Sequence, residues 1–326
     1  MRSLKIEALR ALTDRIIGGY RLKPEDPEVQ ELLTQPLAEL QQEAGRLQKH
    51  FCGNHVDFCT IINARSGRCG ENCKYCAQAA CHHTGCEEYG FLSKEEVMKT
   101  AKADQDAGAN RFAMVTSGRA LTGSDFEKAL DIYRAMKKDL TIDLCASHGI
   151  ISREQFRRLR EAGVTSYHHN IETSRRYFPQ ICTSHTFDDR IRTIKAAQTE
   201  GMCVCSGGII GMGETWQDRL DMAFTLQSLG IESIPINALM AIPGTGMEGR
   251  KPLPAEDILR TIAIFRFINP TANIRLAAGR KLLPQNGATA LLAGASASIT
   301  GNMLTTSGTT IKEDMEMLKE LGLTNH

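Results

Sequence analysis

The sequence predicts an α/β protein: a (β/α)8 TIM-type barrel with an N-terminal helical extension. Beyond residue 50, short apolar runs alternate with longer segments of helical pattern, and no low-complexity linker interrupts the series. This alternation indicates parallel βα units, and eight such units close naturally into a barrel. An open, doubly wound sheet is the structural alternative. The predicted strands cover residues 58–64, 111–116, 141–147, 166–172, 203–210, 233–240, 274–279 and 296–300.

Helices are expected between these runs, in segments rich in helix-forming residues that end at a glycine or an aspartate. The clearest of them cover residues 94–108, 125–139, 152–163 and 189–201.

The first 50 residues are helical in pattern, with a break at 23–28 where two prolines fall. In the first helix, Leu4, Leu9, Leu12 and Ile16 lie roughly on one face, as in an amphipathic helix. We therefore expect two parts, a helical extension at residues 1–50 and a barrel at residues 51–326.

Composition and charge exclude several classes of protein. A net charge of +1 over 326 residues gives no reason to expect binding to nucleic acid or to an anionic membrane. No apolar run is long enough to span a bilayer, and the N-terminus lacks the apolar segment of a signal peptide. We expect a cytoplasmic protein. Its 11 cysteines then favour metal or redox use over a disulfide framework, although some can be small buried hydrophobic residues.

The stretch CGENCKYC at residues 69–76 carries three cysteines with the spacing C-x3-C-x2-C. It follows the first predicted strand, so it lies on a loop at the carboxyl ends of the strands, where barrel enzymes have their active sites. Thiolates from Cys69, Cys73 and Cys76 can bind three irons of a [4Fe–4S] cluster and leave the fourth iron open. An open metal position binds a ligand that reacts, whereas a closed one only holds structure. A three-ligand zinc site or a disulfide is the alternative.

This spacing resembles the signature of the radical S-adenosylmethionine superfamily. The resemblance implies that the open iron binds the amino and carboxylate groups of S-adenosylmethionine, and that cleavage of this cofactor supplies a 5′-deoxyadenosyl radical. Tyr75, directly before the third cysteine, matches an aromatic position of the superfamily. It is implied to pack near the adenine.

Further blocks resemble the biotin synthase family, in order and at fitting intervals. The resemblance implies a (β/α)8 barrel that inserts sulfur between C6 and C9 of dethiobiotin with two molecules of S-adenosylmethionine. A saturated C–H bond offers no acidic proton, so a carbon radical suits this substrate better than acid–base catalysis. The matching blocks are residues 63–78, 167–174, 204–215, 233–245, 275–280 and 304–306.

The resemblance also assigns binding residues. Asn170 and Asn237 are implied to contact the cyclic urea of the substrate, whose N–H and C=O groups complement a side-chain amide. Asn170 and Glu172 are implied to lie near the ribose and methionyl parts of S-adenosylmethionine. Gly207 and Gly208 would allow the backbone to approach the methionyl group closely. For either asparagine, a structural role in a turn or cap is the alternative.

The carboxylate tail of the substrate is implied to meet Thr305 and Thr306, just after the last predicted strand. Arg65 is at the position where the family has a basic residue near the substrate. Without the resemblance, a pair of threonines at a strand end would be structural.

The chain departs from the familiar family pattern at a second, auxiliary cluster. That [2Fe–2S] cluster, thought to donate the sulfur, uses three cysteines and an arginine in the family. Cys145, Cys205 and Arg275 match three of these ligands, but Ala113 stands where the remaining cysteine is expected. Either the cluster is lost or its ligands are rearranged.

Cys59 and Cys203 could replace the missing ligand. Cys203 is two residues from Cys205 on one strand, so both face the same side. With Cys59 and Cys145 they make a four-thiolate set, which suits an auxiliary four-iron cluster better than [2Fe–2S]. A set that includes Cys81 or Cys86 is a competing possibility, and Cys52 and Cys182 receive no role.

Two other functions stay open. A related radical enzyme without sulfur insertion, of the hydrogenase-maturase or mutase type, would not need Asn170, Asn237, the threonine pair and the interior cysteines together. An iron–sulfur scaffold or carrier would not need an open cluster. The family resemblance further implies a homodimer and an electron donor such as flavodoxin or ferredoxin.

Overall fold

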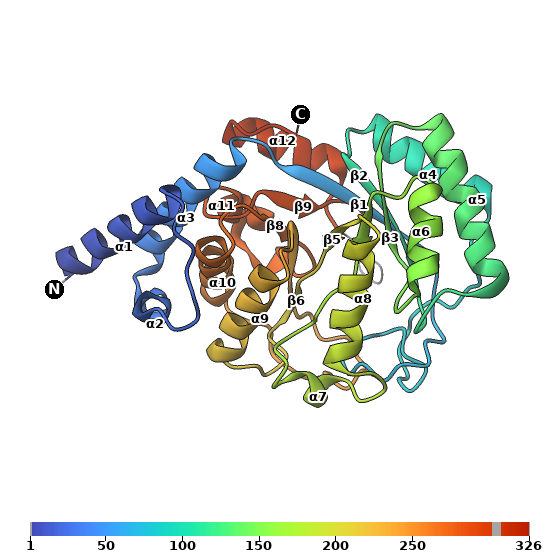
Figure 1. Ribbon diagram of the computed structural model, residues 1–326, viewed down its shortest axis with the longest axis horizontal. Helices are drawn as coiled ribbons and strands as arrows, with labels where there is room; N and C mark the ends of the chain where they lie inside the picture. The colour runs from blue at the N-terminus through green and yellow to red at the C-terminus, as the bar shows by residue number, and fades with distance from the viewer. Residues whose placement is uncertain (1, 302–307, 326) are drawn as a thin grey trace.

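The computed structural model describes residues 2–301 and 308–325, which form a parallel barrel surrounded by helices (Figure 1). The strands are β1 (Asp57–Arg65), β2 (Arg111–Thr116), β3 (Asp143–Ser147), β4 (Ser166–His168), β5 (Cys203–Cys205), β6 (Gly208–Ile210), β7 (Ser233–Ala238), β8 (Asn273–Leu276) and β9 (Ala297–Ile299). They pair in the order β5-β4-β3-β2-β1-β9-β8-β7-β6, and an additional pairing of β5 with β7 closes the ring. The predicted barrel is confirmed.

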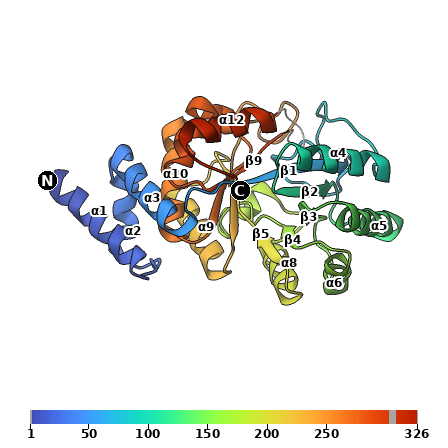
Figure 2. The ribbon, with the colours of Figure 1, turned by 90° about the horizontal axis from the view of Figure 1, so that it is seen from above.

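Helices follow most strands and cover the outside of the barrel. Figure 2 shows α4, α5, α6, α8, α9 and α10 arranged around the strands. The helices are α1 (Arg2–Ile17), α2 (Pro27–Thr34), α3 (Leu37–Cys52), α4 (Lys94–Asp106), α5 (Gly123–Asp139), α6 (Arg153–Glu161), α7 (Phe178–Ile181), α8 (Phe187–Thr199), α9 (Trp216–Ser228), α10 (Ala255–Ile268), α11 (Ala288–Leu291) and α12 (Ile311–Leu321). None of these helices is both long enough and apolar enough to cross a membrane, as far as the described residues go.

The predicted strand at 203–210 forms two strands, β5 and β6, that share one position in the barrel. The chain bends between them because the Ser206 N–H donates to the Ser233 carbonyl (2.9 Å) and Gly207 packs directly on β7. A Cβ atom at Gly207 would lie 1.9 Å from the carbonyl oxygen of Pro235, so only glycine fits there.

The same bend shortens β4, which was predicted to reach residue 172. The N–H groups of Ile171 and Glu172 both donate to the carbonyl of Gly207 (3.0 and 3.1 Å) instead of continuing a regular ladder. β4 therefore ends at His168, and Glu172 takes a positive φ of 69°. Positive φ is uncommon outside glycine and often marks a functional site.

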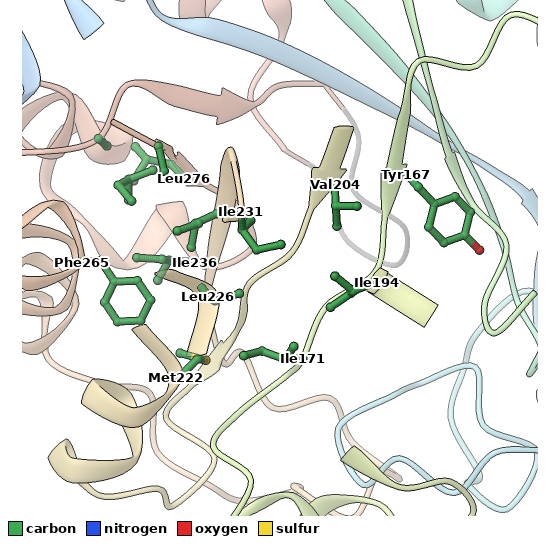
Figure 3. Packing of buried hydrophobic residues seen from close by; sticks show 14 of the residues in the cluster. Tyr167, Ile171, Ile194, Val204, Met222, Leu226, Ile231, Ile236, Phe265 and Leu276 are labelled. Carbon is green, nitrogen blue, oxygen red and sulfur yellow. The ribbon is translucent and has the colours of Figure 1, made fainter. Parts of the chain in front are cut away.

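The hydrophobic core lies between the strands and the helices, and side chains alternate across each strand as expected. On β2, Phe112 and Met114 are buried in this core, whereas Ala113 faces the barrel interior. Figure 3 shows Ile236 of β7 close to Phe265 of α10, within the same core.

The helical extension packs against the barrel through α3, which lies on α10 (Figure 1). Leu9, Leu12 and Ile16 of α1 are buried, which agrees with the apolar face predicted for this helix. The side chain of Gln48 links α3 to the barrel by accepting from the Gly294 N–H (3.1 Å) and donating to the Leu291 carbonyl (2.7 Å).

Loops at the carboxyl ends of the strands enter their helices through capping boxes, in which a Ser or Thr and a residue three positions later exchange hydrogen bonds. In the described chain these boxes begin α4, α6, α8, α9 and α12. In α9, Asp218 accepts from the Thr215 N–H (2.7 Å), from the Ser174 hydroxyl (2.6 Å) and from Arg176. Burial alone would raise the pKa of Asp218, but Arg176, Ser174 and Thr215 lower it to about 2.

We predict that Asp218→Asn lowers the free energy of unfolding by about 1–3 kcal/mol at pH 7, because the buried donors lose a charged acceptor. A carboxylate with a depressed pKa stabilises the fold above its unfolded pKa of about 3.9, and this contribution is lost as the pH falls through about 2. Urea denaturation of the reduced, cluster-free proteins should therefore show a smaller difference in the free energy of unfolding between the wild type and Asp218→Asn at pH 3 than at pH 7. Asp221→Asn, on the exposed side of the same helix, is the control. An equal loss in both variants would contradict the prediction.

Candidate active site

Two cavities lie inside the barrel at different depths. The upper cavity, of about 400 Å³, is lined by residues at the carboxyl ends of the strands and by the loops that follow them. The lower cavity, of about 260 Å³, lies towards the amino ends of the strands. Both cavities are lined by a common wall, which consists of Ile61, Val115, His168, Pro235 and Ile299.

The three predicted cluster cysteines all line the upper cavity. The ends of their loop are paired, because the Cys69 N–H donates to the Gln78 carbonyl (3.0 Å) and the Ala80 N–H donates to the Cys69 carbonyl (2.8 Å). Between them, the Cys76 N–H donates to the Cys73 carbonyl (3.0 Å) in a turn. This turn brings three thiols to one cavity from eight consecutive residues.

These thiols fit a [4Fe–4S] cluster with one open iron. No other cysteine in the described chain lines the upper cavity, so the protein offers three sulfur ligands there and not four. Burial raises the pKa of Cys76 to about 11, so this thiol stays protonated until a metal displaces the proton. Tyr75 lines the same cavity beside them.

A buried ion pair forms part of the wall of the upper cavity. Arg190 lies 3.3 Å from the Glu172 carboxylate and also donates to the Asn170 carbonyl (2.9 Å) and to Nε2 of His185 (3.0 Å). These contacts fix both charged groups at the cavity surface. The family resemblance implied a role for Glu172 but did not single out Arg190, which lies on α8.

Asn170 and Asn237 line the upper cavity, and each amide is held by the backbone. The Asn170 Oδ1 accepts from the Gly207 N–H (3.0 Å), and its Nδ2 lies 3.4 Å from Glu172. The Asn237 Nδ2 donates to the Gly208 carbonyl (3.1 Å), and its Oδ1 accepts from the Ala278 N–H (3.2 Å). An amide has two donor hydrogens and two acceptor lone pairs, so each side chain keeps capacity for a ligand.

Other predicted residues are not brought together with this site. Arg65 does not line the upper cavity itself, and its side chain donates to the carbonyl of Ser117 (3.1 Å), which does line it, and lies 3.3 Å from Asp125. Thr305 and Thr306 lie outside the described residues.

Gly207 and Gly208 also do not line the upper cavity, although a close approach to the cofactor was expected of them. The close approach that they permit is between strands. A Cβ at Gly208 would lie 2.4 Å from the Glu172 carbonyl oxygen, and one at Gly207 would collide with Pro235. Their absent side chains thus serve the packing of the barrel.

The lower cavity is lined by the predicted auxiliary ligands Cys59, Cys145, Cys203, Cys205 and Arg275. Cys59 and Cys145 are buried and pack with Ala113, at the position where the familiar family pattern has a cysteine. Cys205 lies 3.4 Å from Nδ1 of His168 and 3.5 Å from the Ser233 hydroxyl. Cys81 and Cys86 line neither cavity, so the competing ligand set is not assembled.

Cys203 lies at the rim of the lower cavity. It faces the same side as Cys205, as alternation along a strand requires, but it is exposed and close to Glu232. Alternation predicted the correct face of the strand, whereas it says nothing about depth along the barrel axis.

Charges in the lower cavity favour the thiolate of Cys205, whereas burial raises the pKa of Cys59, Cys145 and Cys203. Arg275 is buried and is bound by the Asp57 side chain, by the Asp57 carbonyl (3.0 Å) and by the Ser298 carbonyl (3.1 Å). Burial alone would raise the pKa of Cys205, but His168 and Arg275 lower it to about 7. Cys59 lacks such a hydrogen bond, and burial raises its pKa to about 12.

Sequence reasoning missed a group beside the three-thiol loop. Cys182 and His185 come from the segment after α7, and they contact Cys73 and Glu71. Their only signal in the sequence is that they follow the fourth predicted strand and so lie at the same end of the barrel.

Two family models match the chain. The radical SAM superfamily matches residues 64–226, and the Biotin and Thiamin Synthesis associated domain matches residues 235–324. Among solved structures, a methylornithine synthase has a TM-score of 0.82 at 20% identity and covers 97% of both chains. A maturase of the [FeFe]-hydrogenase has a TM-score of 0.80 at 16% identity, with 99% of this chain and 78% of that chain covered. At these identities the likeness concerns the fold alone.

Curated relatives are much more similar. A biotin synthase from Alkaliphilus metalliredigens is 54% identical over 314 residues, which cover 96% of this chain and 98% of the relative. A biotin synthase from Clostridium beijerinckii is 52% identical over 314 residues, with 96% and 99% covered. The chain therefore belongs to the biotin synthase family of radical S-adenosylmethionine enzymes.

Proposed function

We propose that this enzyme converts dethiobiotin to biotin by sulfur insertion at C6 and C9, with the sulfur supplied by a rearranged auxiliary iron–sulfur cluster. The observation that carries the proposal is the pair of cavities with a common wall. One holds three thiols and the amides suited to a cyclic urea, and the other holds four cysteines and two arginines.

Cys69, Cys73 and Cys76 would hold the [4Fe–4S] cluster at the upper cavity. Together with S-adenosylmethionine, this cluster supplies a 5′-deoxyadenosyl radical that removes hydrogen atoms from unactivated carbon. Tyr75 offers an aromatic surface for the adenine, and the Glu172 carboxylate offers an acceptor for hydroxyl or ammonium groups. Because Arg190 fixes Glu172, this acceptor needs little reordering when the cofactor binds.

Asn237 and Asn170 would orient dethiobiotin in the same cavity. Their backbone contacts leave a donor and an acceptor on each amide, which match the C=O and N–H groups of the urea ring. Thr305 and Thr306 remain the proposed partners of the carboxylate tail. A rigid hold on the ring matters because a radical abstracts a hydrogen from whichever carbon lies nearest.

Cys59, Cys145 and Cys205 are the proposed inner ligands of the auxiliary cluster, with Cys203 as the fourth thiolate at its outer edge. Ala113 takes less space between Cys59 and Cys145 than a cysteine would, which favours a larger, four-iron cluster over [2Fe–2S]. We assign Arg275 to charge compensation, because Asp57 and carbonyl groups already occupy most of its donors.

Three further features complete the proposal. Reduction of the upper cluster would use a one-electron donor such as flavodoxin or ferredoxin, the chain would form a homodimer, and the reaction would take place in the cytoplasm. A related enzyme without sulfur insertion, of the maturase or mutase type, is the second candidate, since a methylornithine synthase and a hydrogenase maturase share the fold. The thiol-lined lower cavity favours sulfur insertion over this candidate.

We predict that the anaerobically reconstituted enzyme, given a reductant, S-adenosylmethionine and dethiobiotin, forms both 5′-deoxyadenosine and biotin. Liquid chromatography with mass detection measures the two products together. Deoxyadenosine without biotin would leave the radical chemistry standing and refute sulfur insertion.

We predict that Asn237→Ala lowers kcat/KM for dethiobiotin by about 10- to 100-fold, the effect of removing one or two hydrogen bonds to a ligand. Deoxyadenosine formation without substrate should change little, because this amide is proposed to contact the substrate and not the cofactor. Asn54→Ala, on an exposed turn before β1, is the control. A parallel loss of both reactions would show that Asn237 acts through the fold, by its bonds to Gly208 and Ala278.

We predict that Cys145→Ala loses about four irons per chain and all biotin formation, yet still cleaves S-adenosylmethionine. Iron and acid-labile sulfide analysis, together with product analysis, checks this. Cys81→Ala, an exposed cysteine outside both cavities, should keep its iron. Loss of the auxiliary iron in Cys81→Ala or Cys86→Ala, with retention in Cys145→Ala, would assign the ligands to the loop instead.

A further inference from the structure

Cys182 contacts Cys73, one of the proposed cluster ligands, on the side away from the upper cavity. Its Sγ atom lies 3.7 Å from the Sγ of Cys73, within hydrogen-bonding range for sulfur, and both residues are buried. Cys182 does not line the upper cavity, whereas Cys73 does. The Cys73 sulfur therefore lies between the space where the cluster would bind and a second thiol.

The fold fixes Cys182 in this position. The Lys74 N–H donates to the Ile181 carbonyl (2.9 Å), which joins the three-thiol loop to the segment that carries Cys182. Asn72 reinforces the junction, since its Oδ1 accepts from the N–H groups of Thr183 (2.9 Å) and Ser184 (3.1 Å). With these backbone contacts on both sides, the distance between the two sulfurs is set by the fold and not by a free side chain.

The residues around Cys182 determine which acceptor its S–H group can donate to. Asn72 Oδ1 lies 3.5 Å away, but the two N–H groups already use both of its lone pairs. The Ser184 hydroxyl, at 3.4 Å, donates to Glu71 and accepts from the Asn72 N–H. The strongest acceptor within reach is then Cys73, once it is an iron-bound thiolate.

His185 supports the same assignment. Arg190 Nε carries a hydrogen and can only donate, so Nε2 of His185 accepts it and Nδ1 carries the imidazole hydrogen. Nδ1 then donates to Glu71 and offers no lone pair to the Cys182 thiol, 3.4 Å away. Because both ring nitrogens are engaged, His185 is not free to join Cys73 and Cys182 in binding a separate metal ion.

We propose that Cys182 is a positioning residue that donates an S–H···S hydrogen bond to the Cys73 thiolate and thereby raises the reduction potential of the [4Fe–4S] cluster. The inference rests on the proposed binding of this cluster by Cys69, Cys73 and Cys76. An iron-bound thiolate has no hydrogen to donate, so the hydrogen between the two sulfurs belongs to Cys182. A hydrogen bond to a ligating sulfur stabilises the more negative, reduced cluster, which makes it easier to reduce.

The test is a potentiometric titration in which electron paramagnetic resonance measures the amount of reduced cluster at each potential. The signal that changes when S-adenosylmethionine is added identifies the upper cluster in the presence of an auxiliary one. Cys182→Ala and Cys182→Val remove the donor. In both variants the midpoint potential of the cluster should fall by about 59 mV, which corresponds to a tenfold smaller equilibrium constant for its one-electron reduction. Cys182→Ser keeps a donor and should recover much of the difference. Cys52→Ala, on α3, is the matched control and should match the wild type.

An unchanged potential in a variant that holds an intact cluster would overturn the inference and leave the proposed function standing. Absence of any such cluster from the wild type would overturn the cluster assignment, and the inference with it. If neither Cys182→Ala nor Cys182→Val binds a cluster, the hydrogen bond is tested by comparing the wild type with Cys182→Ser. Electron–nuclear double resonance in H2O and D2O should show an exchangeable proton coupled to the reduced cluster that changes in Cys182→Ser. An identical spectrum in Cys182→Ser would count against the proposal.

Discussion

The contact between Gly207 and Pro235 holds the barrel closed and fixes residues of both cavities. Because Gly207 lies directly against β7, the chain can bend between β5 and β6 without leaving its place in the sheet. The Gly207 N–H binds Asn170, and its carbonyl accepts from the backbone of Glu172. Two residues earlier in the chain, Cys205 faces the lower cavity. A side chain at Gly207 would therefore displace Asn170 and Glu172 at the upper cavity and Cys205 at the lower cavity.

In both cavities, carboxylates balance the charges of the arginines. In the upper cavity, Arg190 and Glu172 neutralise each other at the wall. In the lower cavity, Arg275 and Arg111 are both close to Asp57, and Asp143 and Glu232 line the same cavity, so carboxylates match the two arginines. Within this balance, His168 and Arg275 lower the pKa of Cys205 and so favour its thiolate. The common wall is mostly apolar, with His168 as its one polar side chain among the five.

The barrel and the three-thiol loop could be predicted because their signals are local. Apolar runs mark strands, and three cysteines within eight residues need only one loop to come together. The surroundings of Arg65 and of the glycines at 207 and 208 could not be predicted, because a register shift and a strand-to-strand contact set them. Alternation gave the face of Cys203 but not its exposure. Cys182 was missed because its partner, Cys73, is 109 positions away in the chain.

The lower cavity has its own entrance. Asp143, Cys203 and Asn273 are the first residues of their strands, and all three line this cavity. Asp143 and Cys203 are exposed, so the cavity opens at the amino end of the barrel, opposite to the three-thiol loop. An enzyme that gives up sulfur from an internal store must refill that store between rounds. If the lower cavity holds the sulfur-donating cluster proposed above, iron and sulfide would reach it from the amino ends of the strands without passing through the upper cavity.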